Sequence, residues 1–550
     1  MASHPPLADY HNLPVTVMGL GRFGGGLGAV KFLLDRGARV TVTDLRPEAQ
    51  LADTLKEFDA SQLVRLHCGG HTDADFADAQ LLVVNPAVKP NCPWLKKARE
   101  RGIPRTSEMN LFWQHNRGRV IGVTGSNGKS TTTALIAHLL KTAGRTVHLG
   151  GNLGGSLLPI VDSIEPTDWV VLELSSFQLA DLDRIEASPE IAVVTNFAPN
   201  HLDWHPDLDD YRRAKQTILR WQSEDSTAVL NGEDADVREW PTLGRVWLFG
   251  QTSGSLSPAG DVADLNDFRC GGEGGGEGVH AEVLPPHPGP LTHSHVLSES
   301  SADRGGEGAE NVGHVSYVPE KEMRSVGFSP RLSKVDMPAW AKAHATNTRL
   351  LDLFPLPGQH NRMNAAAAIC AVLAVGVEWE SLAEGLRTFR GLPHRLEFVG
   401  EVAGRRFYND SLATTPESAI CALKAFPGRV LLLAGGYDKR VDLSEFAREA
   451  AARATAIAWM GQTAERLHAL AMQTLEEHGG LTSPARCRSQ WITHNLREAF
   501  EWLWEQSQPG DTILLSPACA SFDWFLNFAD RGEQFRTLVR EAEEGLWPRV

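Results

Sequence analysis

The chain has 550 residues, of which 42% are hydrophobic and 22% charged, and its net charge is −15. This composition is typical of a globular protein with about three or four domains, and the acidic balance argues against nucleic acid as a partner, because phosphate backbones select basic surfaces. The seven cysteines form no C-x-x-C pair, and no apolar run resembles a signal peptide or a membrane span, so we expect a reduced, cytoplasmic protein without membrane insertion.

Residues 15–46 predict a strand, a glycine turn, a helix and a second strand that ends at Asp44. The glycine positions of a G-x-G-x-x-G pattern are filled by Gly19, Gly21 and Gly24. Such glycines let the backbone approach a phosphate at a helix N-terminus, and an acidic residue at the position of Asp44 can bind a ribose. The pattern predicts a nucleotide-binding, Rossmann-like domain over residues 1–117. It does not choose between NAD and another nucleotide, and a turn with only a packing role is the alternative.

Residues 120–150 repeat this order around a second glycine loop. The loop contains Gly125 and Gly128 and leads directly into Lys129 and Ser130, between an apolar strand and a helix. In a loop of this kind the backbone N–H groups hold phosphate oxygens, the lysine reaches the terminal phosphates, and the serine hydroxyl can bind Mg²⁺. The segment therefore predicts binding of a nucleoside triphosphate.

Three further apolar runs predict parallel strands of a central P-loop ATPase-type domain, which we expect over residues 118–391. These runs are residues 168–176, 189–197 and 226–234. Glu173 lies near the end of the first run, where ligands of open α/β sheets bind, and a carboxylate there can hold Mg²⁺. Residues 251–345 interrupt the pattern with Gly-, Ser-, His- and Pro-rich sequence, which predicts a disordered insertion.

The segment 196–216 follows the second of these runs and contains His201 and Lys215. We expect its helix to begin near Asp209 or Asp210, which are suited to an N-cap. Composition alone leaves His201 open to a structural or a functional interpretation, and it favours a solvated surface position for Lys215.

Residues 353–550 complete the predicted architecture. Asn361 and Asn364 open an alanine-rich helix, and residues 391–399 predict a linker into a third, Rossmann-like α/β domain over 392–550. The predicted strand ends of this domain carry Asp410, Lys439 and Ser521. The expected fold class is therefore α/β with three domains, the central one built on a mostly parallel sheet.

Several short motifs now add a family to this interpretation. They are TGSNGKST, ELSSFQL, NHLDWH, YRRAK, GQHNRMN, LPHRLE, NDSLATT, SPACASFDWF and NFADRGEQF. Together they resemble the Mur ligase family and cover the chain except for the insertion. The resemblance implies an ATP- and Mg²⁺-dependent ligase that joins D-glutamate to UDP-N-acetylmuramoyl-L-alanine through an acyl phosphate, in peptidoglycan precursor synthesis. We expect the protein to be a monomer.

The resemblance assigns roles to individual residues. The implied catalytic residues are Lys129, His201 and Lys215, the last of them carbamylated. The implied ATP-binding residues are Gly125, Ser126, Asn127, Gly128, Lys129, Ser130, Thr131, Asn361, Asn364, Arg395 and Asp410. The implied UDP-substrate residues are Gly19, Gly21, Asp44, Arg46, Asn152 and Ser175. The implied glutamate-binding residues are Thr414, Lys439, Ser521 and Phe528. The implied magnesium ligands are Ser130, Glu173, His201 and Lys215.

Some positions depart from the family pattern, and alternatives stay open. Leu412 stands where relatives often carry Lys, Ala87 stands at a glycine position, and Arg22 and Phe23 replace smaller residues. One alternative is a sister ligase for another amino acid, such as L-glutamate, or a folylpolyglutamate synthase, which the first glycine turn disfavours. Others are an NAD(P)-dependent oxidoreductase, which would leave Lys129 without a role, and a catalytically silent binding protein.

Overall fold

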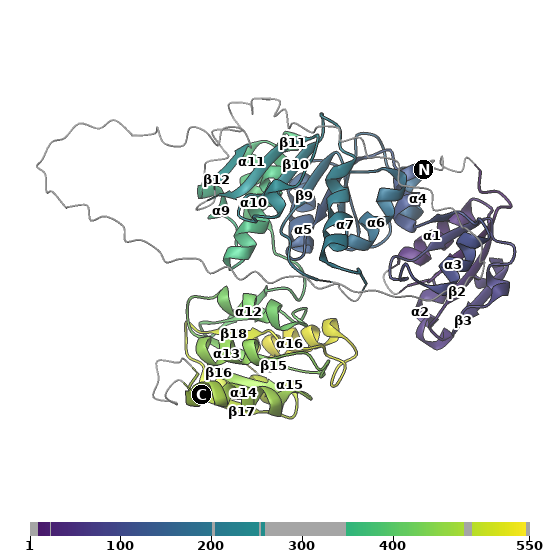
Figure 1. Cartoon of the computed structure of the whole chain (residues 1–550). Coiled ribbons are helices and arrows are strands. Elements are labelled where there is room, and N and C mark those ends of the chain that lie inside the picture. Colours follow the sequence, from purple (N-terminus) through teal and green to yellow (C-terminus); the bar gives the residue numbers. More distant parts are fainter. Residues whose placement is uncertain are drawn as a thin grey trace, which may run out of the picture. The chain divides into compact units, whose positions relative to one another are not determined.

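The structure is a computed structural model of the chain. It describes residues 9–21, 24–200, 204–251, 255–258, 348–477 and 487–545. Their strands form three separate sheets, each accompanied by helices (Figure 1). Among these residues, none of the helices combines the length and the apolar character that crossing a bilayer requires.

The first sheet has five strands, all parallel. In sheet order they are β3 (Arg65–Cys68), β2 (Arg39–Asp44), β1 (Pro14–Met18), β4 (Leu81–Val84) and β5 (Arg105–Thr106). The α-helices of this part are α1 (Gly25–Asp35), α2 (Ala52–Leu55), α3 (Pro93–Glu100) and α4 (Glu108–His115). Val15 and Val17 of β1 share a core with Phe32 and Leu33 of α1. The glycine turn follows β1, beside β4, where the order of the strands reverses and α/β sheets bind ligands.

The second sheet has seven strands, which are parallel except at one edge. In sheet order they are β12 (Ser255–Pro258), β11 (Arg245–Gln251), β10 (Thr227–Asn231), β9 (Ile191–Val194), β6 (Arg119–Thr124), β8 (Trp169–Glu173) and β7 (Val147–Gly151). Its α-helices are α5 (Lys129–Thr142), α6 (Ser176–Leu182), α7 (Leu208–Arg220), α9 (Thr348–Leu351), α10 (Gln359–Val375) and α11 (Trp379–Thr388).

Two features of this sheet concern the predictions. The alanine-rich α10 shares a core with α5, and its small side chains allow the two helices to pack closely. The antiparallel strand β12 lies near the start of the predicted insertion, and its residues join the sheet because they pair with β11. Residues 259–345 of that insertion lie outside the described part of the chain.

The third sheet has six strands, and only β13 is antiparallel to its neighbour. In sheet order they are β13 (Glu397–Val402), β14 (Arg405–Asn409), β18 (Thr512–Leu515), β15 (Val430–Gly435), β16 (Ala454–Met460) and β17 (Ser489–Ile492). Its helices are α12 (Pro416–Lys424), α13 (Ser444–Arg453), α14 (Ala464–Glu477), α15 (Leu496–Gln506) and α16 (Phe528–Glu543). Alternate residues of β15 enter two different cores, so both faces of the sheet are covered.

The predicted α/β fold class is confirmed, since each of the three sheets is mostly parallel and is accompanied by helices. One local expectation needs correction, because the predicted linker 391–399 already contains the first residues of β13. We keep the domain boundaries after residues 117 and 391 as a proposal. They are compatible with Arg119, which opens the second sheet, and with Glu397, which opens the third.

Candidate active site

The loop between β6 and α5 requires glycine at two positions. Gly125 and Gly128 have φ angles of 148° and 82°, which residues other than glycine rarely adopt. A Cβ atom at Gly125 would also overlap the hydroxyl of Thr195, and one at Gly128 would overlap the side-chain oxygen of Asn364. The loop therefore keeps a bare backbone, as a phosphate-binding loop needs.

The rest of the predicted P-loop follows directly. The backbone N–H of Asn127 donates to Asn196 Oδ1 at 2.8 Å, and the hydroxyl of Ser126 donates to the Ala198 carbonyl at 2.8 Å. These bonds fix the loop to the segment after β9. The next predicted residues, Lys129, Ser130 and Thr131, form the first turn of α5.

Lys129 folds back over the loop. Its Nζ atom donates to the carbonyl oxygens of Gly125 and Ser126 at 2.9 and 3.0 Å. Burial lowers the pKa of Lys129, the charge of Glu173 opposes this, and Arg395 adds to it. The ammonium is thus held at the place where the loop would receive phosphate oxygens.

Glu173 ends β8 beside this lysine and is 2% exposed. Its Oε1 atom accepts a hydrogen bond from Asn152 Nδ2 at 3.0 Å, whereas its buried Oε2 atom has no partner. A buried carboxylate oxygen is rarely left unpaired in a native protein. Oxygen donors are also what Mg²⁺ prefers, so this atom fits the predicted metal site.

Lys215 of α7 lies in the interior, with 2% of its surface exposed. Its Nζ atom donates to the Gly125 carbonyl at 2.8 Å and to Thr124 Oγ1 at 3.3 Å. Burial, and then the charge of Lys129, hold the pKa of Lys215 well below its usual range against the opposing effect of Glu173. The expectation of a solvated surface lysine is therefore wrong, and Lys215 contacts the P-loop.

The helix that carries Lys215 begins earlier than predicted. Its N-cap is Asp207, whose side chain accepts from the backbone N–H of Asp210 at 2.7 Å. The predicted start at Asp209 or Asp210 is therefore wrong by one or two residues, because the aspartate before them takes the cap. The predicted catalytic residue His201 lies outside the described residues.

Of the predicted magnesium ligands, His201 lies outside the described residues, whereas Ser130 and Glu173 offer oxygen atoms. Among the residues that the structure describes, no three His, Cys, Asp or Glu side chains gather as a metal site. Glu173 supplies one carboxylate, and Ser130 supplies a hydroxyl in the first turn of α5. A phosphate, or a modified Lys215, would add a further anionic oxygen.

A cavity of about 260 Å³ opens beside the P-loop. Among its lining residues are six of the predicted ATP-binding set: Asn127, Gly128, Asn361, Asn364, Arg395 and Asp410. Burial raises the pKa of Asp410 to about 7, although Ser516 and nearby arginines oppose this. Sequence analysis missed His360, which also lines the cavity and whose pKa falls to about 4 through burial and the charge of Arg395. Its position inside the quoted motif GQHNRMN was the available signal.

In the first sheet, Asp44 holds the glycine turn instead of leaving its carboxylate free. Its Oδ2 atom accepts from the backbone N–H of Leu20 at 2.8 Å and from Arg46 at 3.0 Å. Burial raises the pKa of Asp44, but these hydrogen bonds outweigh it and leave the pKa below its usual value. Gly19 and Gly21 have φ angles of 89° and 77°, which favour glycine, and a Cβ atom at Gly19 would lie 2.8 Å from Asn85 Cβ.

The remaining predicted UDP-substrate residues lie at the end of β8 and beside it. Asn152 binds Glu173, as described above. Ser175 is the N-cap of α6, and its hydroxyl accepts from the backbone N–H of Gln178 at 3.3 Å within a capping box. In this structure Ser175 is thus occupied in starting the helix.

The four predicted glutamate-binding residues lie at the carboxyl ends of neighbouring strands of the third sheet. Thr414 follows β14, Lys439 follows β15, and Ser521 and Phe528 follow β18. Ser521 is buried, whereas Lys439 and Phe528 are exposed. Such a sheet edge is where α/β domains bind ligands.

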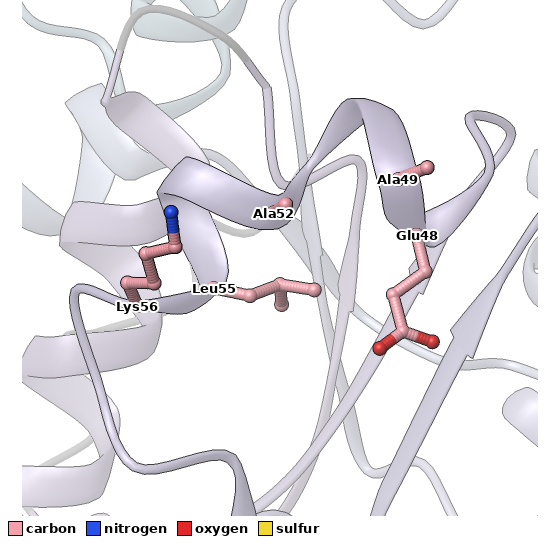
Figure 2. A pocket seen from close by; sticks show the side chains of 5 residues that line it. All are labelled: Glu48, Ala49, Ala52, Leu55 and Lys56. Atoms are coloured by element: carbon pink, nitrogen blue, oxygen red, sulfur yellow. The ribbon is translucent and has the colours of Figure 1, made fainter.

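A second surface pocket lies between β2 and β3 in the sequence, and Figure 2 shows its lining residues. Its volume is about 390 Å³, and it is lined by Glu48, Ala49, Ala52, Leu55 and Lys56. It contains none of the predicted site residues. Three of its five lining residues are apolar, and it lies apart from the glycine turn and the P-loop residues named above.

Three family models match the chain. They are the Mur ligase MurD-like N-terminal domain over residues 14–107, the Mur ligase middle domain over 123–268, and the Mur ligase glutamate ligase domain over 394–519. Together with the full-length relatives below, these matches show that the chain belongs to the Mur ligase family.

The relatives cover nearly the whole chain. A UDP-N-acetylmuramoylalanine–D-glutamate ligase from Symbiobacterium thermophilum is 33% identical over 524 residues, 95% of this chain and 97% of that protein. One from Anaeromyxobacter dehalogenans is 36% identical over 532 residues, 96% and 97% of the two chains. Among solved structures, the UDP-N-acetylmuramate–alanine ligase of Thermotoga maritima aligns with a TM-score of 0.51 at 17% identity, covering 96% of this chain and 100% of that one. This last likeness concerns the fold alone.

Proposed function

We propose that this enzyme uses ATP to join D-glutamate to UDP-N-acetylmuramoyl-L-alanine in the synthesis of peptidoglycan precursors. Relatives named for that activity match 95 to 96% of the chain at 33 to 36% identity. The observation that supports this chemistry is that Lys129, Glu173 and Lys215 lie close together at the P-loop. The proposed role places the enzyme in the cytoplasm, and we propose that it acts as a monomer.

The proposed reaction has two steps. A carboxylate and an amine do not condense unaided in water, so an oxygen of the substrate carboxylate first attacks the γ-phosphorus of ATP and ADP leaves. The amine of glutamate then attacks the acyl carbon, and phosphate leaves as the amide forms. Negative charge develops on the phosphoryl oxygens during the first step, and the ammonium of Lys129 lies on the loop where it would stabilise that charge.

We propose Glu173, Ser130, His201 and a carbamate on Lys215 as the holders of magnesium. When bound, Mg²⁺ would supply charge neutralisation at the phosphoryl oxygens. A carbamate forms when a neutral amine attacks CO2, makes an N–C bond and loses a proton. The low pKa of Lys215 favours the neutral amine, and the product is an anion suited to a metal site. The unpaired oxygen of Glu173 supports the same placement.

The other residues divide between three ligands. We propose that Asn361, Asn364, Arg395 and Asp410 bind ATP together with the P-loop. The glycine turn and Arg46, fixed by Asp44, would hold the diphosphate and uridine. Thr414, Lys439, Ser521 and Phe528 would bind glutamate.

The test is an assay with ATP, Mg²⁺, UDP-N-acetylmuramoyl-L-alanine and each enantiomer of glutamate. We expect phosphate release that depends on D-glutamate, with one amide product formed per phosphate, identified by its mass. Equal or better use of L-glutamate, or phosphate release without amide, would overturn the proposal. An absorbance change with NAD(P) and no ATP consumption would favour the oxidoreductase instead.

A further inference from the structure

His205, which sequence analysis did not single out, is completely buried between two elements of the site. The side chain has no exposed surface. Its Nδ1 atom lies 2.8 Å from Asp210 Oδ2 in α7, and its Nε2 atom lies 2.9 Å from Ser176 Oγ in α6. With Nδ1–H donating to the carboxylate of Asp210, Nε2 accepts from the Ser176 hydroxyl.

The same ring is held by aromatic neighbours on both sides. It stacks on Phe177 of α6 with ring centres 5.8 Å apart and contacts Tyr211 of α7 at 5.2 Å. Trp204, the preceding residue, packs on both His205 and Phe177 with ring centres 4.6 Å apart. His205 therefore joins α6 to α7 by two hydrogen bonds and by ring packing.

A predicted site residue lies just before the first of these helices and another lies within the second. Helix α6 follows β8 after two residues, and β8 ends at Glu173. In α7, Tyr211 lies one turn before Lys215, whose Nζ atom is 4.9 Å from the tyrosine ring. The hydroxyl of Tyr211 is also 3.3 Å from Ser126 Oγ in the P-loop. The joined segments are thus those that hold Glu173, Lys215 and the P-loop.

We propose that His205 is a positioning residue for the ligase reaction, fixing the segment of Glu173 against the helix of Lys215. The inference rests on the proposed function. The serine, histidine and aspartate follow the hydrogen-bond order of a hydrolase triad, but Ser176 is 2% exposed and offers no access to an acyl substrate. A displacement of about 1 Å among catalytic groups can lower the rate on the order of 100-fold. Loss of the His205 hydrogen bonds should therefore lower kcat.

The test compares His205→Phe with a matched variant, His148→Phe. The first keeps an aromatic ring and removes both hydrogen bonds. The control removes another partly buried histidine–aspartate pair, His148 Nε2 to Asp168 Oδ2 at 3.0 Å, next to the opposite end of β8 from Glu173. The comparison therefore separates the loss of a buried pair in this sheet from the loss of the join.

We expect His205→Phe to lower kcat at least about 10-fold while KM for the UDP substrate stays within about twofold. The melting temperature should fall by a similar amount in both variants, and His148→Phe should keep its kcat. His205→Asn, which can still donate to Asp210, should recover part of the lost kcat. Ser176→Ala removes only the Nε2 bond and should show a smaller loss of kcat; it decides the question if His205→Phe does not fold.

Equal losses of kcat in His205→Phe and His148→Phe would overturn the inference, and so would an unchanged kcat in His205→Phe. If His205→Phe does not fold, an unchanged kcat in Ser176→Ala would overturn it. The wild-type enzyme, assayed in parallel, separates this result from the proposed function. Ligation by the wild type with unaffected variants removes only the role of His205, whereas no ligation by the wild type removes the function itself.

Discussion

Asn364 of α10 occupies the space that a side chain at Gly128 would need. Gly128 is the N-cap of α5 and has a φ of 82°. Gly128→Ala would therefore combine an unfavourable backbone conformation, which costs about 1–2 kcal/mol, with displacement of Asn364. We expect nucleotide binding to weaken at least about 10-fold, measured by calorimetry with ADP and Mg²⁺.

Gly144→Ala is the matched control for that prediction. Gly144 lies just after the other end of α5 with a φ of 71°, and a Cβ atom there would meet nothing within 4 Å. It should share the loss of stability but bind nucleotide normally. Equal binding by both variants would contradict the role given to Asn364.

Lys129→Ala should abolish measurable turnover, with a loss of at least about 100- to 1,000-fold in kcat, because it removes a charge that acts on the transition state. Its Nζ atom contacts two loop carbonyls, and its positive charge repels that of Lys215. Because the variant loses few favourable contacts, it should stay folded. Activity and thermal melting are measured on the same preparation. Lys141→Ala, an exposed change near the end of the same helix, should leave both unchanged, and unfolding of Lys129→Ala would count against the prediction.

Lys215→Ala should be nearly inactive and partly rescued by formate or acetate. The reason is that a small carboxylate can enter the vacated space and replace the oxygens of the proposed carbamate. Initial rates are measured against increasing formate at constant ionic strength. Rescue by methylammonium instead would indicate that the amine itself is the working group.

Glu108→Gln should stabilise the protein at high pH. Glu108 opens α4, accepts a hydrogen bond from Ser156 Oγ at 2.5 Å, and burial raises its pKa from 4.5 to about 7. Between these values the folded protein holds a proton that the unfolded chain has lost, so the free energy of unfolding falls as pH rises and levels off above about 7. The glutamine removes this penalty, which amounts to at most about 3 kcal/mol.

Urea unfolding at pH 5 and pH 8 measures the effect. The advantage of Glu108→Gln over the wild type should be several times larger at pH 8. Glu48→Gln, an exposed change in the same part of the chain (Figure 2), should show no such dependence. A constant difference for Glu108→Gln at both pH values would refute the linkage.

The sequence predicted well those features that depend on neighbours along the chain. The two strand–glycine–helix units are examples, because the positive φ angles at Gly19 and Gly128 are a local requirement. The positions of Lys129 and Glu173 relative to the strands were predictable for the same reason, because Lys129 follows one apolar strand and Glu173 ends another.

Features that depend on distant partners were not predictable from the residues alone. Lys215 has the position of a surface lysine in its helix, and only the packing of α7 against the P-loop buries it. Glu108 is similar, since its partner Ser156 lies 48 residues away. The short strand β12 has a polar sequence, and only its pairing with β11 makes it part of the sheet.

The distribution of the hydrophobic cores has a consequence for thermal unfolding. Tyr10 and Phe32, from the first part of the chain, belong to the same continuous core as Leu158 and Leu172, which accompany the second sheet. The third sheet has two cores of its own. Heat should therefore unfold the first two sheets as one cooperative unit. We expect calorimetry to show a second transition, in which residues 397–543 unfold by themselves.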